Sequence, residues 1–188
     1  MFAFPVEPTI YRYGQLAARS ISSQFGYRSS PDGVGSTNHK GIDFPVDVGT
    51  RVLAIGPGTV RKVIPNHAQA GTYVEIDHGN GYWSRYLHLS RVDVTSGARV
   101  AQGTAIGLSG GAPGAYGSGA STGPHLHLEI WQGQPYAGGT AVDPLPLLSE
   151  STALLTSAVA AGATVAWWVA AGALLVGALF LLRPRSEE

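Results

Sequence analysis

The segment TGPHLHLEIW, residues 122–131, places two histidines two positions apart in a short apolar run. Its alternation of polar and apolar residues is typical of a β-strand with one solvated face and one buried face. Residues i and i+2 of a strand lie on one face, about 6.8 Å apart, so we expect His125 and His127 to point the same way. Taken alone, the pair allows two ligands of one metal ion, one ligand beside a catalytic base, or two structural histidines.

A second segment, NHKGIDF, supplies a histidine and an aspartate four positions apart, His39 and Asp43. Gly41 and the β-branched neighbours favour an extended stretch, in which positions 39, 41 and 43 share a face and the glycine leaves room between the ligands. Two imidazoles and one carboxylate would leave a fourth position for water, the open arrangement of catalytic zinc. Cysteine is absent, which excludes a thiolate site, but the spacing alone also allows other divalent ions.

A third segment, YLHLS, places His88 at the end of a stretch that we expect to be the second strand of a hairpin. A histidine near a metal ion but not bound to it can orient water, take its proton or stabilise an oxyanion. Glu129 shares the predicted strand face of the two neighbouring histidines and is suited to pair with one of them. We interpret His78 as the cap of the DHGNG turn, and His67 as a solvated loop residue that could rim a groove.

The elements that must position these residues are short and β-like. TYVEIDHGNGYWSRYLHL alternates on either side of HGNG, which is a strong hairpin signal. GTRVLAIGPGTVRKVI predicts two strands around a Gly-Pro-Gly turn, and ARVAQGTAIGLSG predicts further short strands. Residues 109–123 predict a long loop that leads into the two histidines, and such loops in compact domains are usually functional. Apart from a short helix near YGQLAARSI, we expect a mainly β, antiparallel fold before residue 151.

Charge and composition exclude several classes of protein. The chain of 188 residues has 12 basic and 12 acidic side chains, so it has no basic field that could bind nucleic acid. The lack of cysteine excludes disulfides and leaves the compartment open. The 26 glycines are about twice the average usage and are spread through turns, as expected for a strand-rich domain.

The C-terminal region has a different composition. No charged residue occurs between positions 151 and 182, and residues 158–182 are mostly alanine, valine, leucine and glycine. A helix of this length, at about 1.5 Å per residue, crosses the roughly 30 Å hydrocarbon core of a bilayer. The sequence therefore predicts one C-terminal transmembrane α-helix that contacts the lipid bilayer. It contains no GxxxG pair, and the oligomeric state stays unknown.

The orientation of this span follows from the charges beside it. Arg183 and Arg185 follow it directly, whereas no lysine or arginine lies between Arg99 and the span. The positive-inside rule therefore places the β-domain on the non-cytoplasmic, cell-wall side. The N-terminus has no basic n-region, and prolines interrupt its apolar stretch, so we expect no secretory signal peptide there, which leaves the route of export open.

Five segments together resemble one family. QFGYR, NHKGIDFPVDVGTRVLAIGPGTV, YVEIDHGNGYWSRYLHLS, GARVAQGTAIGLSG and STGPHLHLEI resemble the lysostaphin/LytM-like zinc metallopeptidases of the M23 class, in the family's order. The resemblance implies a zinc endopeptidase that cuts peptides of bacterial peptidoglycan on an antiparallel β-sheet. The expected organisation is a lead-in (1–23), a peptidase domain (24–148), a linker (149–157), a transmembrane helix (158–182) and a charged tail (183–188).

The resemblance also assigns roles to the histidines. The HxxxD motif makes His39 and Asp43 zinc ligands, and the second histidine of HxH, His127, is the third ligand. The first histidine of HxH, His125, and the histidine of HLS, His88, become the catalytic pair. The sequence does not divide the proton-transfer and oxyanion roles between these two.

The sequence fits other functions less well. A catalytically weak domain of the same fold, which binds peptidoglycan or activates another hydrolase, would have lost metal ligands, and all five positions are present here. A biotinyl or lipoyl carrier needs a lysine at an exposed hairpin tip, and neither Lys40 nor Lys62 lies in that context. The compact layout favours a phage or virion-associated lysin slightly over a cellular envelope enzyme. The bond that is cut, the host and its cross-bridge are not encoded in any motif.

Overall fold

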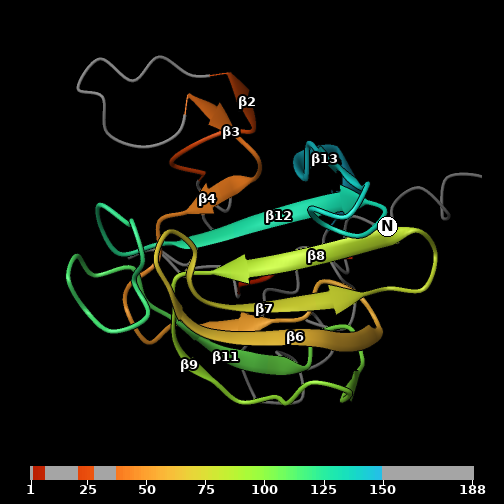
Figure 1. Cartoon of the computed structure of the whole chain (residues 1–188), viewed down its shortest axis with the longest axis horizontal. Coiled ribbons are helices and arrows are strands. Elements are labelled where there is room, and N and C mark those ends of the chain that lie inside the picture. The colour runs from red at the N-terminus through yellow and green to blue at the C-terminus, as the bar shows by residue number, and fades with distance from the viewer. Residues whose placement is uncertain (1, 7–20, 28–36, 150–188) are drawn as a thin grey trace, which may run out of the picture. The chain divides into compact units, whose positions relative to one another are not determined.

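β-Branched and aromatic stretches form the strands, because such side chains pack well on a pleated surface. The computed structural model describes residues 2–6, 21–27 and 37–149, which belong to one compact unit (Figure 1). The largest sheet has seven strands in the order β10-β6-β7-β8-β12-β13, with β4 also paired to β12. Their bounds are β4 (Ile42–Phe44), β6 (Gly58–His67), β7 (Gly71–Asp77), β8 (Tyr82–Leu87), β10 (Arg99–Val100), β12 (Leu126–Gln132) and β13 (Thr140–Val142).

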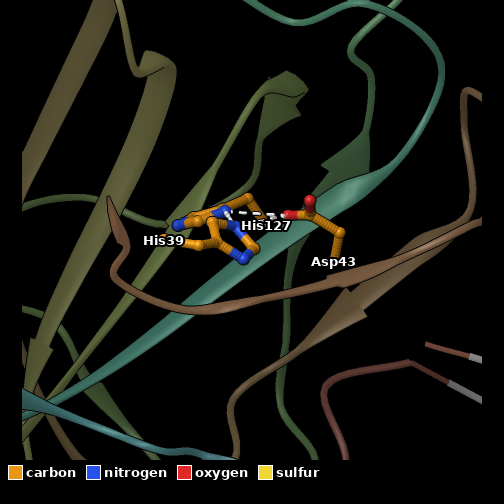
Figure 2. A group of neighbouring side chains, drawn as sticks. All are labelled: His39, Asp43 and His127. Carbon is orange, nitrogen blue, oxygen red and sulfur yellow. Dashed lines mark hydrogen bonds and ion pairs between the residues drawn. The ribbon is translucent and has the colours of Figure 1, made fainter. Parts of the chain in front are cut away.

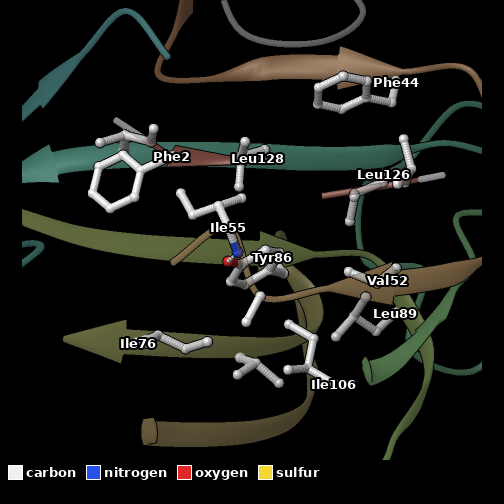
Figure 3. Packing of buried hydrophobic residues seen from close by; sticks show 14 of the residues in the cluster. Phe2, Phe44, Val52, Ile55, Ile76, Tyr86, Leu89, Ile106, Leu126 and Leu128 are labelled. Atoms are coloured by element: carbon white, nitrogen blue, oxygen red, sulfur yellow. Dashed lines mark hydrogen bonds between the residues drawn. The ribbon is translucent and has the colours of Figure 1, made fainter. Parts of the chain in front are cut away.

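A second, three-stranded sheet has the order β5-β11-β9 and lies below the large sheet in Figure 1. Its strands are β5 (Arg51–Leu53), β9 (Leu89–Val92) and β11 (Ala105–Ser109). Buried aliphatic side chains from both sheets meet in one core, as Figure 3 shows. The one buried phenol among them, Tyr86, accepts the backbone N–H of Ile55 at 2.9 Å, so its polar atom is not left unpaired.

Three smaller elements complete the described residues. β1 (Phe2–Ala3) pairs in parallel with β14 (Leu148–Ser149), and β2 (Gly26–Tyr27) pairs antiparallel with β3 (Asn38–His39). A short 3₁₀ turn, η1 (Leu145–Leu147), precedes β14.

Strand β12 brings the functional segments together. It pairs with β8 along one edge, and with β4 and β13 at different points along the other edge. In this register His127 is the partner of Asp43 on β4 and of Leu87 on β8. Segments that are far apart in the sequence therefore meet at one end of β12.

Most of the predicted β organisation is confirmed. The hairpin around HGNG is β7 and β8, as predicted. The segment 38–44, predicted as one extended stretch, forms two short strands, β3 and β4, with a bend at Gly41 between them. The two strands predicted around the Gly-Pro-Gly turn form as β5 and β6, but they pair in different sheets. The predicted helix near residues 13–21 falls almost wholly outside the described residues, and the predicted membrane span 158–182 lies wholly outside them. Among the described residues, no helix is long and apolar enough to cross a membrane.

The prediction of a solvated face on β12 is wrong. The polar residues within the strand are buried too, with His127 exposed by 8% and Glu129 by 3%, and Gln132 at its end is exposed. The reason is that these polar side chains contact one another and neighbouring side chains such as Arg85 instead of water. The alternating pattern thus marks a buried polar site rather than a solvent-exposed face.

Candidate metal centre and adjoining histidine pair

The three predicted metal ligands converge on one point. His39 Nε2 lies 2.9 Å from His127 Nδ1, which lies 2.8 Å from Asp43 Oδ1 (Figure 2). The third distance, from His39 Nε2 to Asp43 Oδ1, is 3.3 Å. His39 ends β3, and the two others are register partners on β4 and β12, so backbone pairing fixes all three side chains.

The outer nitrogen of each imidazole is bonded to an acceptor. His39 Nδ1 donates to the backbone carbonyl of Gln24 at 2.7 Å, and His127 Nε2 donates to Glu129 Oε1 at 3.3 Å. These partners fix the tautomers, because a neutral imidazole carries one proton. The inner nitrogens therefore present lone pairs to the carboxylate oxygen of Asp43, and three electron-rich atoms face one another.

This donor set fits a divalent cation. Tetrahedral zinc with bonds of about 2.0–2.1 Å separates its ligand atoms by about 3.3–3.4 Å. The distance from His39 to Asp43 matches this value, and the other two are about 0.5 Å shorter. The three residues are exposed by only 3% to 9%. An ionised carboxylate and two neutral imidazoles are the protonation states in which these three side chains bind a cation.

Gly41 is required between the ligands, as the sequence indicated. A Cβ at this position would overlap the backbone carbonyl of Leu128 and lie 2.9 Å from His127 Nε2. The glycine thus allows the chain between His39 and Asp43 to press against β12.

The two other predicted site histidines lie beside the ligands. The rings of His88 and His125 are 4.7 Å apart, and His125 Nε2 is 3.7 Å from Asp43 Oδ1. Each ring donates its Nδ1–H to a backbone carbonyl, His88 to Ser118 at 2.8 Å and His125 to Gly123 at 2.8 Å. In the neutral form of each ring Nε2 is therefore the nitrogen without a proton, and in His125 it is the nitrogen nearer Asp43.

Both of these carbonyls belong to the predicted glycine-rich loop. Gly117 adopts φ 81°, and a Cβ there would lie 2.6 Å from the carbonyl of Leu89. Its own carbonyl accepts the N–H of Thr72 at 2.8 Å, which fastens the loop to β7. His88 itself has φ 62°, a conformation that is strained for any residue with a Cβ. Burial, and then the charge of neighbouring His125, lowers the pKa of His88 to about 4.

A buried charge network supports the ligand His127. Glu129 accepts from Arg85 Nη1 at 2.7 Å and from the indole N–H of Trp131 at 2.7 Å, and Arg85 Nε lies 3.4 Å from Glu75 Oε2. Burial opposes the charge of Glu129, but the bond to His127 and the charge of Arg85 lower its pKa to about 2. The sequence indicated Glu129 only. Arg85 and Glu75 escaped notice because their proximity depends on the order of β7, β8 and β12.

An open groove of about 520 Å³ leads to the ligands. Histidine, tyrosine and charged side chains form its walls. Its lining residues are Asn38, His39, Lys40, His67, Gln69, Ala70, Tyr73, Arg85, Leu87, His88, His127, Glu129 and Tyr136.

The two remaining histidines have structural contacts. His67 Nδ1 accepts the backbone N–H of Gln69 and of Ala70 at the rim of the groove. The prediction that His78 caps the DHGNG turn is wrong. Asp77 caps the turn instead, because its Oδ1 accepts the N–H of Gly79. The His78 ring turns inward instead, to Pro57 O at 2.8 Å and Ser84 Oγ at 2.9 Å, where the Phe2 ring packs on it.

A convergent His₂Asp set beside two oriented histidines, with His39, His88 and His127 lining an open groove, is the arrangement of a metal-dependent hydrolase. The chain belongs to peptidase family M23, whose model matches residues 37–144, and this confirms the resemblance seen in the sequence.

Three relatives illustrate the likeness. Peptidoglycan DD-endopeptidase ShyA of Vibrio cholerae serotype O1 is 48% identical over 98 residues, which cover 52% of this chain and 21% of that protein. Glycyl-glycine endopeptidase ALE-1 of Staphylococcus capitis is 34% identical over 128 residues, 68% of this chain and 33% of that protein. The solved catalytic domain of lysostaphin from Staphylococcus simulans superposes with a TM-score of 0.60 at 29% identity, over 69% of this chain and 91% of that domain. This chain spans only about a fifth to a third of the length of the first curated relatives it matches.

Proposed function

We propose that this chain is a zinc-dependent endopeptidase that hydrolyses peptide bonds of bacterial peptidoglycan. The observation that carries the proposal is the convergence of the lone pairs of His39, Asp43 and His127 beside a histidine pair with a fixed tautomer. Family membership supports it, as do relatives whose names specify peptidoglycan and glycyl-glycine bonds.

The residues of the chain divide the chemistry between them. His39, Asp43 and His127 would hold the ion, which supplies Lewis acidity toward a scissile carbonyl and activates water. His88 and His125 each keep Nδ1–H on a loop carbonyl, so Nε2 accepts a proton from the attacking water. Once protonated, the same nitrogen donates to the tetrahedral oxyanion or to the leaving amine.

The test is digestion of purified peptidoglycan by the full-length protein. Sacculi with direct cross-links and sacculi with glycine bridges are incubated with the protein, with chelator, and with zinc restored, and the products are identified by mass spectrometry. We expect new peptide termini that vanish with chelator and return with zinc. Intact sacculi of both types, despite stoichiometric bound zinc, would instead favour a binding or hydrolase-activating domain.

We further propose that the peptidase domain acts at a membrane, on its non-cytoplasmic face. Support comes from the uncharged segment 158–182 and from Arg183 and Arg185 directly after it. Membrane fractionation followed by protease protection tests this proposal. Shielding of the domain on the cytoplasmic side would contradict it, and co-purification with phage particles would establish the virion-associated form.

A further inference from the structure

Lys40 is a cation with an unusual setting in the groove. It directly follows the ligand His39, and its ammonium lies 4.5 Å from the ring centre of Tyr136 and 5.6 Å from that of Trp131. The two rings are themselves in contact, with centroids 4.8 Å apart. Lys40 and Tyr136 line the groove together with His39 and His127.

The other charged groups that line the groove are already paired. Arg85 binds Glu129 at 2.7 Å, and Glu129 also contacts His127 and Trp131. Within the described residues, by contrast, no carboxylate lies within 4.0 Å of the Lys40 ammonium. Cation–π contacts orient this ammonium but leave its charge uncompensated. The groove therefore contains one positioned cation without an anion.

The backbone places the aromatic partner at an energetic cost. Tyr136 adopts φ 57°, which a residue with a Cβ rarely does, and its side chain is 63% exposed. Its ring also contacts the Arg85 guanidinium, at 5.0 Å from the ring centre, so two cations approach this ring. Neither burial nor a hydrophobic contact with the core explains why this strained residue presents its ring at the groove.

We propose that Lys40, held on Tyr136 and Trp131, binds a free carboxylate of the substrate next to the bond that is cut. This inference rests on the proposed peptidase function and narrows its substrate. The preferred peptides carry an unamidated carboxylate at the cross-link, as a diaminodicarboxylic residue does, whereas an oligoglycine bridge offers none there. The closeness to the scissile bond follows from Lys40 being the chain neighbour of a metal ligand.

Two matched cross-linked peptides test the proposal, one with a free carboxylate beside the scissile bond and one with a carboxamide there. The zinc-loaded protein should cleave the carboxylate peptide with a roughly 10- to 100-fold higher kcat/KM, the range expected for a hydrogen bond to a charged group. Lys40→Met should remove most of that preference through KM, and Lys40→Arg should keep it. Tyr136→Leu, an exposed change that leaves the core intact, should weaken it.

Lys62→Met is the matched control, because Lys62 is paired with Glu75 at 3.1 Å and does not line the groove. It should keep the preference, and bound zinc is measured in every variant. Equal kcat/KM for both peptides in the wild type, or an equal loss on both in Lys40→Met with zinc retained, would overturn the inference.

Calorimetry on the zinc-loaded His125→Ala variant separates this result from failure of the proposed function. Tighter binding of the carboxylate peptide there supports the Lys40 site even without cleavage. Equal affinity for both peptides counts against it.

Discussion

The metal ligands and the histidine pair are neighbours, yet the fold positions them in different ways. The ligands lie on paired strands, and the register of β12 with β4 sets the contact between His127 and Asp43. His88 and His125 lie just outside strands, and main-chain carbonyls of the glycine-rich loop orient them. With the roles proposed above, metal binding depends on sheet register and catalysis on loop conformation, so the two properties should be separable by mutation.

The sharpest test of this separation compares two histidines that are two positions apart. We expect His127→Ala to lose its bound zinc and all activity, because only two ligands remain. His125→Ala should retain most of its zinc. Metal content after dialysis, measured by atomic absorption, distinguishes the two variants, and equal zinc loss in both would contradict the division of roles.

Substitution of His88 or His125, which the loop carbonyls orient, should lower the catalytic rate without changing metal binding. His88→Ala and His125→Ala should each lower kcat by about 10² to 10⁴, the range for loss of an acid–base group or an oxyanion donor. Steady-state cleavage of a soluble peptidoglycan fragment measures this loss at saturating zinc. A variant whose activity is restored by excess zinc would belong with the ligands instead.

Glu129, which binds the outer nitrogen of His127, should affect the affinity for zinc. Glu129→Gln removes the charge that binds His127 Nε2, so we expect zinc affinity to fall about 10- to 100-fold. Competition with a chromophoric chelator gives the dissociation constant. Asp93→Asn is the control, because Asp93 pairs with Arg91 at the surface, away from the groove, and should leave affinity unchanged. An unchanged affinity in Glu129→Gln would remove Glu129 from the metal centre.

His78 provides a contrast to both groups, since it is half-buried and its contacts are structural. Burial lowers its pKa, despite the opposing bond to Pro57 and the charge of Asp77. As the pH falls, His78 is therefore protonated more readily in the unfolded chain than in the folded protein. Its contribution to stability is complete above the unfolded pKa and declines as the pH falls below it. Urea unfolding at pH 7.5 and 5.5 should show a smaller decline in His78→Gln than in the wild type, with zinc content unchanged; equal declines would contradict this reading.

The sequence predicted the parts of the site that local spacing determines. HxxxD with Gly41, the HGNG hairpin and the shared face of His125 and His127 all depend on strand periodicity, which residue types reveal. The division of the HxH pair came from the family resemblance, because strand geometry directs both rings toward one ion. The structure adds the difference that spacing could not give: His125 precedes β12 and is bonded to the loop, whereas His127 lies within the strand.

Other features were beyond reach from the sequence. The Arg85 network requires the order of three strands, which no single segment encodes. The burial of Glu129 was missed because an alternating pattern describes a solvated face and a buried polar site equally well. The carbonyls that orient the histidine pair are backbone atoms, which every residue supplies, so no residue type marks them.

The backbone of His88 has a consequence for stability as well as for rate. Its φ of 62° is unfavourable for a residue with a Cβ but acceptable for glycine. Glycine in place of alanine normally destabilises a folded protein, by roughly 0.5–1 kcal/mol within regular structure. At position 88 we expect the reverse order, with His88→Gly more stable than His88→Ala by about 1 kcal/mol in urea unfolding. Because both variants lack the imidazole, the difference between them measures the strain of the backbone at position 88 separately from the loss of the side chain.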